Sequence, residues 1–140
     1  MKNCVQRNSY LGAGPRPWLK LDFRDTSGNV RTSKLVADTG SPQAVVLAPT
    51  VFEELVLIQI DSITNNFGQS DGGWLQLYMP ECGLVERIKG YSNLQVEQIV
   101  RKSHPDLVGL VGLPILRLGE YGGDANSFWF RYPPSNTPSP

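Results

Sequence analysis

Hydrophobic and polar residues alternate along 18–24, where leucine and phenylalanine share one face and charged residues occupy the other. Alternation with a period of two residues is typical of a β-strand with one buried face. The polar segment 25–29 is rich in turn-forming residues, and 30–37 has the composition of a second strand. Two strands joined by such a turn predict a β-hairpin.

Shorter apolar runs predict most of the remaining elements. They indicate strands at 44–47, 74–78, 84–88, 94–100, 107–111 and 127–131. Thr50 and Glu53 have the spacing of a capping box, which predicts a short helix after Pro49. A second short helix is expected at 112–118, because its proline falls in the first turn, where proline is tolerated. Glycine and asparagine at 65–73 indicate a flexible connection.

Chain length and the spread of helix-breaking residues favour one small all-β domain. The chain has 140 residues, enough for a single domain, and its 14 glycines and 11 prolines favour short elements. We expect an N-terminal segment at 1–16, a folded domain at 17–132 and a proline-rich disordered tail at 133–140. No internal repeat is evident, so two similar lobes within one chain are not expected.

Composition excludes several classes of function. The 13 basic and 13 acidic residues cancel, which removes the electrostatic signature of a nucleic-acid binder. No apolar run approaches the roughly 20 residues that a membrane helix needs, and 1–10 lacks the apolar core of a signal peptide. Cys4 and Cys82 allow at most one disulfide, and with a single histidine they do not make a usual zinc site. We therefore expect a cytoplasmic protein with no membrane partner, metal or cofactor.

The segment 35–41, Leu-Val-Ala-Asp-Thr-Gly-Ser, carries the most informative chemistry. An apolar strand ends by delivering the carboxylate of Asp38 to a tight loop. Gly40 removes side-chain bulk beside that carboxylate, and the hydroxyls of Thr39 and Ser41 can donate hydrogen bonds. This pattern places one acidic group at a defined position.

The same segment resembles the active-site loop of the aspartic proteases. A second segment at 110–116, which contains Gly112, resembles the apolar-apolar-glycine and short helix near the end of retropepsin-like domains. The resemblance covers about 18–130 and is strongest to bacterial retroviral-type single-domain enzymes. It implies a retropepsin-like closed β-barrel with one or two short helices and one lobe per chain. Retroviral enzymes usually carry Arg-Asn or Arg-Asp after the late glycine, whereas this chain has Leu-Pro, so their inter-subunit polar network is not carried over.

The resemblance implies an aspartic endopeptidase that works as a homodimer on a peptide or protein substrate. In this class two carboxylates share a proton around one water, which attacks the peptide bond. The chain has a single Asp-Thr-Gly, so two copies of Asp38 must meet on a two-fold axis, with Thr39 bonding across it. The expected flap spans 68–74, with Gly72 and Gly73 at its tip and Trp74 over the substrate.

Plainer interpretations of the same residues remain open. Asp and Gly dominate turns, so Asp38 and Asp124 are also readable as ordinary turn residues. A catalytically silent dimerisation or peptide-binding module on the same fold is the main alternative, since folds host unrelated functions. An unrelated β-barrel binding protein is a third. His104 is expected to be a solvated side chain, and Cys82 a small packed one.

Overall fold

The computed structural model describes residues 2–65 and 68–135 and confirms the all-β class. In these residues the strands are β1 (Cys4–Ser9), β2 (Trp18–Arg24), β3 (Val30–Asp38), β4 (Val45–Leu47), β5 (Ile58–Asn65), β6 (Gly68–Met79), β7 (Leu84–Ser92), β8 (Leu107–Gly112), β9 (Glu120–Gly123) and β10 (Ser127–Tyr132). The helices are α1 (Pro49–Leu55), α2 (Leu94–Ser103) and α3 (Leu113–Leu116), with a 3₁₀ turn η1 at Pro80–Cys82.

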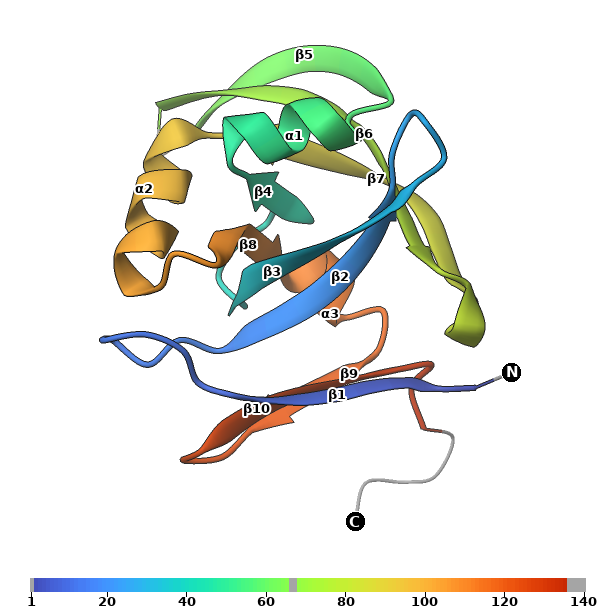
Figure 1. The fold of residues 1–140 in the computed structure, drawn as a ribbon, viewed down its shortest axis with the longest axis vertical. Helices are drawn as coiled ribbons and strands as arrows, with labels where there is room; N and C mark the ends of the chain where they lie inside the picture. The colour runs from blue at the N-terminus through green and yellow to red at the C-terminus, as the bar shows by residue number, and fades with distance from the viewer. Residues whose placement is uncertain (1, 66–67, 136–140) are drawn as a thin grey trace.

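A closed barrel forms the body of the molecule (Figure 1). Its strands follow the order β2-β3-β8-β4-β7-β6, and a short β2–β6 pairing closes the circle. The alternating residues of β2 behave as predicted, because Leu19, Leu21 and Phe23 are all fully buried in the main core. The predicted hairpin is also confirmed, with β2 and β3 antiparallel around the 25–29 turn. Strand β5 extends the barrel sheet beyond β6.

A separate three-stranded sheet lies beside the barrel, in the order β1-β10-β9 (Figure 1). The sequence pattern predicts no strand in the segment 1–16, yet β1 pairs with β10 along its whole length. A disulfide between Cys4 and Cys82 ties β1 to η1 at the end of the barrel. The two ends of the chain are thus joined in one sheet. Residues 136–140 of the expected tail lie outside the described residues.

The strand predicted at 94–100 is wrong, because this segment is the helix α2. The side chain of Asn93 accepts a hydrogen bond from the backbone N–H of Val96 and caps the first turn. Val96 and Val100, four residues apart, are buried on the same side of the helix. Leu94 and Val96 alternate as strand residues would, so the local pattern fits both structures. The prediction of one or two short helices therefore omitted α2, which is a third helix among the described residues.

The helix predicted after Pro49 is α1, but its expected capping box is absent. The N-cap is Ala48, with no side-chain hydrogen bond, and Thr50 lies inside the first turn. Pro49 starts the helix at a position where its missing N–H costs nothing. The second predicted helix is confirmed as α3, which directly follows β8. Among the described residues, no helix has the length and apolar character needed to cross a membrane.

Candidate active site

The two segments that carry the resemblance meet in the barrel. Strand β3 ends at Asp38 and pairs in parallel with β8, so that Asp38 lies opposite Gly112. The pair joins segments far apart in the chain, which local pattern alone does not predict. Asp38 is thereby fixed at the end of a buried strand, at the point where the chain turns away from the barrel.

Gly112 lets the Asp38 loop lie directly against β8. A Cβ atom at this position would lie 1.9 Å from the backbone oxygen of Gln43 and 2.8 Å from that of Ser41. Backbone hydrogen bonds close the contact, since the Gly112 N–H donates to Ala44 O at 2.9 Å and the Leu113 N–H to Ser41 O at 3.1 Å. The loop is therefore held by backbone groups, and no side chain fits between it and β8.

The Asp38 carboxylate is positioned but sparsely hydrogen-bonded. Its Oδ1 accepts the backbone N–H of Gly40 at 3.0 Å, the one hydrogen bond to this carboxylate among the described residues. The residue is half-exposed, whereas Thr39 and Gly40 are exposed. A carboxylate has about four lone-pair sites for hydrogen bonds. Most of its acceptor capacity is left for water or a ligand.

A pocket of about 220 Å³ opens beside Asp38. Its walls are mainly aliphatic: Val36 and Leu110 come from the paired strands β3 and β8, and Ile99 comes from α2. Asp38 is the acidic residue among those that line the pocket. A larger pocket of about 400 Å³, lined by Lys34 and Glu54 among others, includes no residue of the Asp38 loop. A ligand in the aliphatic pocket would therefore lie beside the Asp38 carboxylate, whereas one in the larger pocket would not.

Arg16 lines the same pocket and is not among the site residues predicted from the sequence. In the β2–β3 ladder Trp18 pairs with Val36, and the Ala37 N–H donates to Pro17 O at 2.9 Å. Continuing that register places Arg16 opposite Asp38. The signal was available, because pairing residue 24 with residue 30 across the predicted turn aligns position 16 with position 38.

The expected flap tip is wrong for Gly72 and Gly73. Both glycines are buried in the middle of β6, paired with β5 on one side and β7 on the other. A Cβ on Gly72 would lie 2.9 Å from the Tyr91 ring, so these glycines permit close packing. The β5–β6 ladder ends at the Asn65–Gly68 pair, and 66–67 lie outside the described residues. Trp74 is half-exposed on β6, and its role over a substrate stays a prediction.

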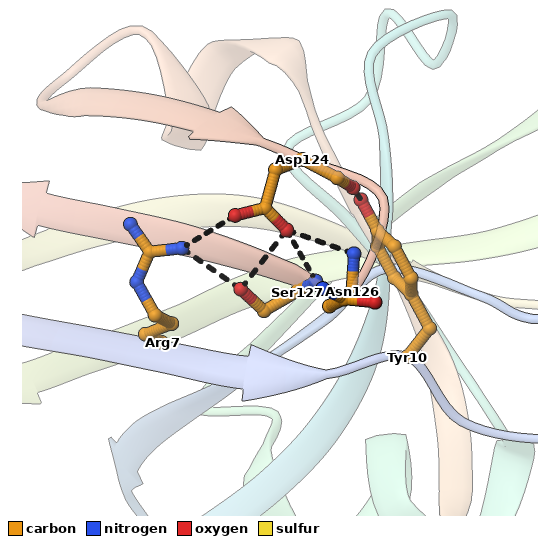
Figure 2. A network of polar contacts seen from close by, with 5 residues as sticks. All are labelled: Arg7, Tyr10, Asp124, Asn126 and Ser127. Atoms are coloured by element: carbon orange, nitrogen blue, oxygen red, sulfur yellow. Dashed lines mark hydrogen bonds and ion pairs between the residues drawn. The ribbon is translucent and has the colours of Figure 1, made fainter.

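Asp124 is a structural carboxylate, as its sequence context predicts (Figure 2). Its Oδ1 accepts the backbone N–H groups of Asn126 at 2.8 Å and Ser127 at 2.9 Å, and Arg7 lies 3.4 Å from Oδ2. The Asn126 N–H, then the Ser127 N–H, and more weakly Arg7 hold the pKa of Asp124 below its ordinary value. Tyr10, the residue after β1, donates its hydroxyl to the Asp124 backbone oxygen at 2.6 Å and so connects the network to the end of β1. The network closes the β9–β10 turn.

Other candidate reactive groups are occupied or isolated. Cys82 is disulfide-bonded to Cys4, so it has no thiol to act as a nucleophile. His104 accepts the backbone N–H of Asp106 through Nδ1 at 3.1 Å, in the turn after α2. Across residues 2–65 and 68–135, no group of three or more His, Cys, Asp or Glu residues is arranged to hold a metal ion.

Comparisons with known proteins find a likeness at the level of structure. No protein-family model matches the chain, and no curated protein matches it. Among solved structures, the chain is similar to the crystal structure of a retropepsin-like aspartic protease from Rickettsia conorii, with 14% sequence identity and a TM-score of 0.48. The likeness covers 93% of this chain and 99% of that one.

Proposed function

We propose that this chain is an aspartic endopeptidase that works as a homodimer. In this proposal a water molecule between two Asp38 carboxylates, one from each protomer, attacks the scissile peptide bond. One carboxylate takes a proton from the water, and the protonated other one polarises the carbonyl. The enzyme needs no metal or cofactor for this chemistry.

The observation that carries the proposal is the state of the Asp38 carboxylate. It is fixed at the end of β3 by the close approach of Gly112, yet it accepts one hydrogen bond among the described residues and borders a pocket. A group that serves only to stabilise a turn would have its oxygens satisfied by neighbouring donors. A general base needs a defined place and free lone pairs.

The homodimer follows from the chemistry of the pocket. Two carboxylates are required, and Asp38 is the acidic residue that lines this pocket. A two-fold axis beside the loop would bring the second one from another copy of the chain. Thr39 and Gly40 are exposed in the single chain, which leaves the loop accessible to a partner. Contacts other than the Arg-Asn type must then hold the dimer, because Leu113 and Pro114 follow Gly112.

The test is cleavage of a diverse peptide library at about pH 4 to 7 by the wild type and by Asp38→Asn. Glu86→Gln, which changes an exposed acid on β7, serves as the matched control. We expect the Asn variant to lose about 10²-fold or more of the activity and the control to keep it. Wild-type activity should rise more steeply than linearly with enzyme concentration where the dimer dissociates.

Three other outcomes would overturn the proposal. Equal cleavage by the wild type and Asp38→Asn would assign the activity to different chemistry. A folded dimer that cleaves no peptide would instead support the silent dimerisation or peptide-binding module. A protein that stays monomeric at all concentrations would favour an unrelated barrel. Sedimentation of the same samples separates the last two outcomes.

The expected cytoplasmic location stays a prediction, and the Cys4–Cys82 disulfide argues against it. Disulfides persist mainly in oxidising compartments, because thioredoxin and glutathione keep cytosolic thiols reduced. Alkylating the protein in its native cells and counting modified cysteines by mass spectrometry checks this. Two modified cysteines would support the cytoplasm, whereas none would support an oxidising compartment.

A further inference from the structure

Arg16 is a cationic residue whose backbone is held beside the proposed catalytic group. Its backbone is held by a two-way pairing with Leu11, in which the Arg16 N–H donates to Leu11 O at 2.8 Å and the Leu11 N–H to Arg16 O at 3.1 Å. This bridge follows β1 and directly precedes β2. The β2–β3 register then sets Arg16 opposite Asp38, and both residues line the aliphatic pocket.

The guanidinium of Arg16 has no ion pair within the described residues, its neighbour Asp38 included. Arg31 and Arg131 differ from it, since they pair with Asp25 and Glu120. Arg16 is also exposed. A cation that is placed by the backbone and left unpaired at a pocket is arranged for an anionic group from outside the chain.

The pocket itself favours an aliphatic side chain. Val36 and Leu110 form its strand walls, while Val96 and Ile99 of α2 form the opposite side. Burial of aliphatic carbon against such walls is favourable. The site thus combines apolar walls with two charged residues, Arg16 and Asp38.

We infer that Arg16 is a specificity-determining residue that binds an acidic side chain of the peptide substrate, two residues away from the aliphatic side chain that fills the pocket. The inference rests on the proposed function. Successive side chains of an extended peptide point to opposite sides, so residues two apart share a side and lie about 6.6 Å from each other. Because Arg16 lines the same pocket, this spacing assigns the second neighbour of the aliphatic side chain to the guanidinium.

The experiment measures peptide binding to Asp38→Asn protein, which retains the pocket and leaves the peptide uncleaved. The probes are fluorescein-labelled peptide pools with a fixed leucine and with glutamate, glutamine or lysine two residues away on both sides. We expect the glutamate pool to bind about threefold to tenfold more tightly than the lysine pool, because the Arg16–carboxylate pair is exposed and solvent-screened. A pool with serine for the fixed leucine should bind more weakly than its leucine counterpart.

The decisive variant is Arg16→Glu in the same Asp38→Asn protein. It should reverse the order, with the lysine pool now binding more tightly than the glutamate pool. Arg87→Glu, an exposed charge reversal on β7, should keep the original order and controls for net charge. Equal affinities for all pools, an unchanged order in Arg16→Glu, or no binding of any pool would overturn the inference.

The readouts keep this inference separate from the proposed function. Binding needs no catalysis, so a reversal of order in Arg16→Glu supports the specificity role even if wild-type protein cleaves nothing. Conversely, cleavage that depends on Asp38 but shows no preference for glutamate supports the proposed protease activity and overturns the specificity role of Arg16. A shift in dimer dissociation with Arg16→Glu and an unchanged peptide order would assign Arg16 to the subunit interface and overturn the inference.

Discussion

Two loops of the barrel begin with the same residues and use them differently. Asp25-Thr26-Ser27-Gly28 follows β2, and Asp38-Thr39-Gly40-Ser41 ends β3. The Asp25 carboxylate accepts backbone N–H groups from Ser27 and Asn29, each at 2.9 Å, and its side chain is 6% exposed. The Arg31 Nε–H adds a third donor at 3.1 Å.

The number of donors separates a structural carboxylate from one that is free to react. Asp25 is satisfied within its own turn, and the Asn29 N–H is the main cause that holds its pKa below the ordinary value. Asp38 accepts one N–H from its loop. Asp124 belongs with Asp25, because its donors also come from its own turn (Figure 2). An Asp-Thr turn is thus a weak sign of chemistry until its hydrogen bonds are counted.

The largest loss of stability is expected from Gly112→Ala, which disrupts the close contact between β8 and the Asp38 loop. The new methyl group would collide with the Gln43 backbone oxygen, at 1.9 Å, so β8 and the loop must separate. We expect a loss of about 3 kcal/mol in the free energy of unfolding, together with loss of cleavage. Urea denaturation measures the first.

Gly40→Ala in the same loop is the matched control for Gly112→Ala. Its Cβ would meet the Asp38 Oδ1 at 3.3 Å, a side-chain atom that has room to shift. A small change in stability is therefore expected. If Gly112→Ala were as stable as Gly40→Ala, the close approach of loop and strand would not be what fixes Asp38.

The next prediction exchanges the two carboxylates for amides. Asp25→Asn should lower the melting temperature by several degrees, because an amide presents N–H groups where donors already converge. Asp38→Asn should change the unfolding free energy by no more than about 0.5 kcal/mol, since its carboxylate holds little of the fold together. Differential scanning calorimetry of both variants checks the contrast. A larger loss of stability in Asp38→Asn would reverse the assignment of the two loops.

The sequence predicts this contrast only in part. The alternation along 18–24 and the turn residues at 25–29 predicted the hairpin that carries both loops. It did not predict β1, whose polar residues are stabilised by pairing with β10 and by a disulfide across 78 positions. Such partners are set by the whole fold. The motif predicted Asp38 as a candidate site residue. The close packing of its loop against Gly112 depends on the parallel β3–β8 pairing, which only the tertiary structure supplies.

The pH dependence of stability gives a finer comparison. Because the folded pKa of Asp25 is lowered from 3.8, its charge stabilises the fold above that value, and this stabilisation is lost as the pH falls through the lower folded pKa. The difference in melting temperature between wild type and Asp25→Asn should therefore be largest near pH 6, and it should decrease progressively as the pH drops below about 4. Asp124 and Glu120, whose pKa values are also lowered, are common to both proteins and cancel.

A smaller effect than that of Gly112→Ala is expected at the other end of the Asp25 turn, in Gly28→Ala. Gly28 has φ of +83°, in the left-handed region, and its N–H donates to the Asp25 backbone oxygen at 3.0 Å. An alanine there should cost about 1 kcal/mol of unfolding free energy, through backbone conformation and without a collision. Gly14→Ala is the control, because no atom lies within 4 Å of its Cβ position and its φ is not positive. Gly112→Ala should cost clearly more than Gly28→Ala, since one glycine is needed for space and the other for backbone conformation. Equal losses of unfolding free energy would contradict this distinction. The Asp38 loop would then not depend on close packing against β8 any more than the Asp25 turn does.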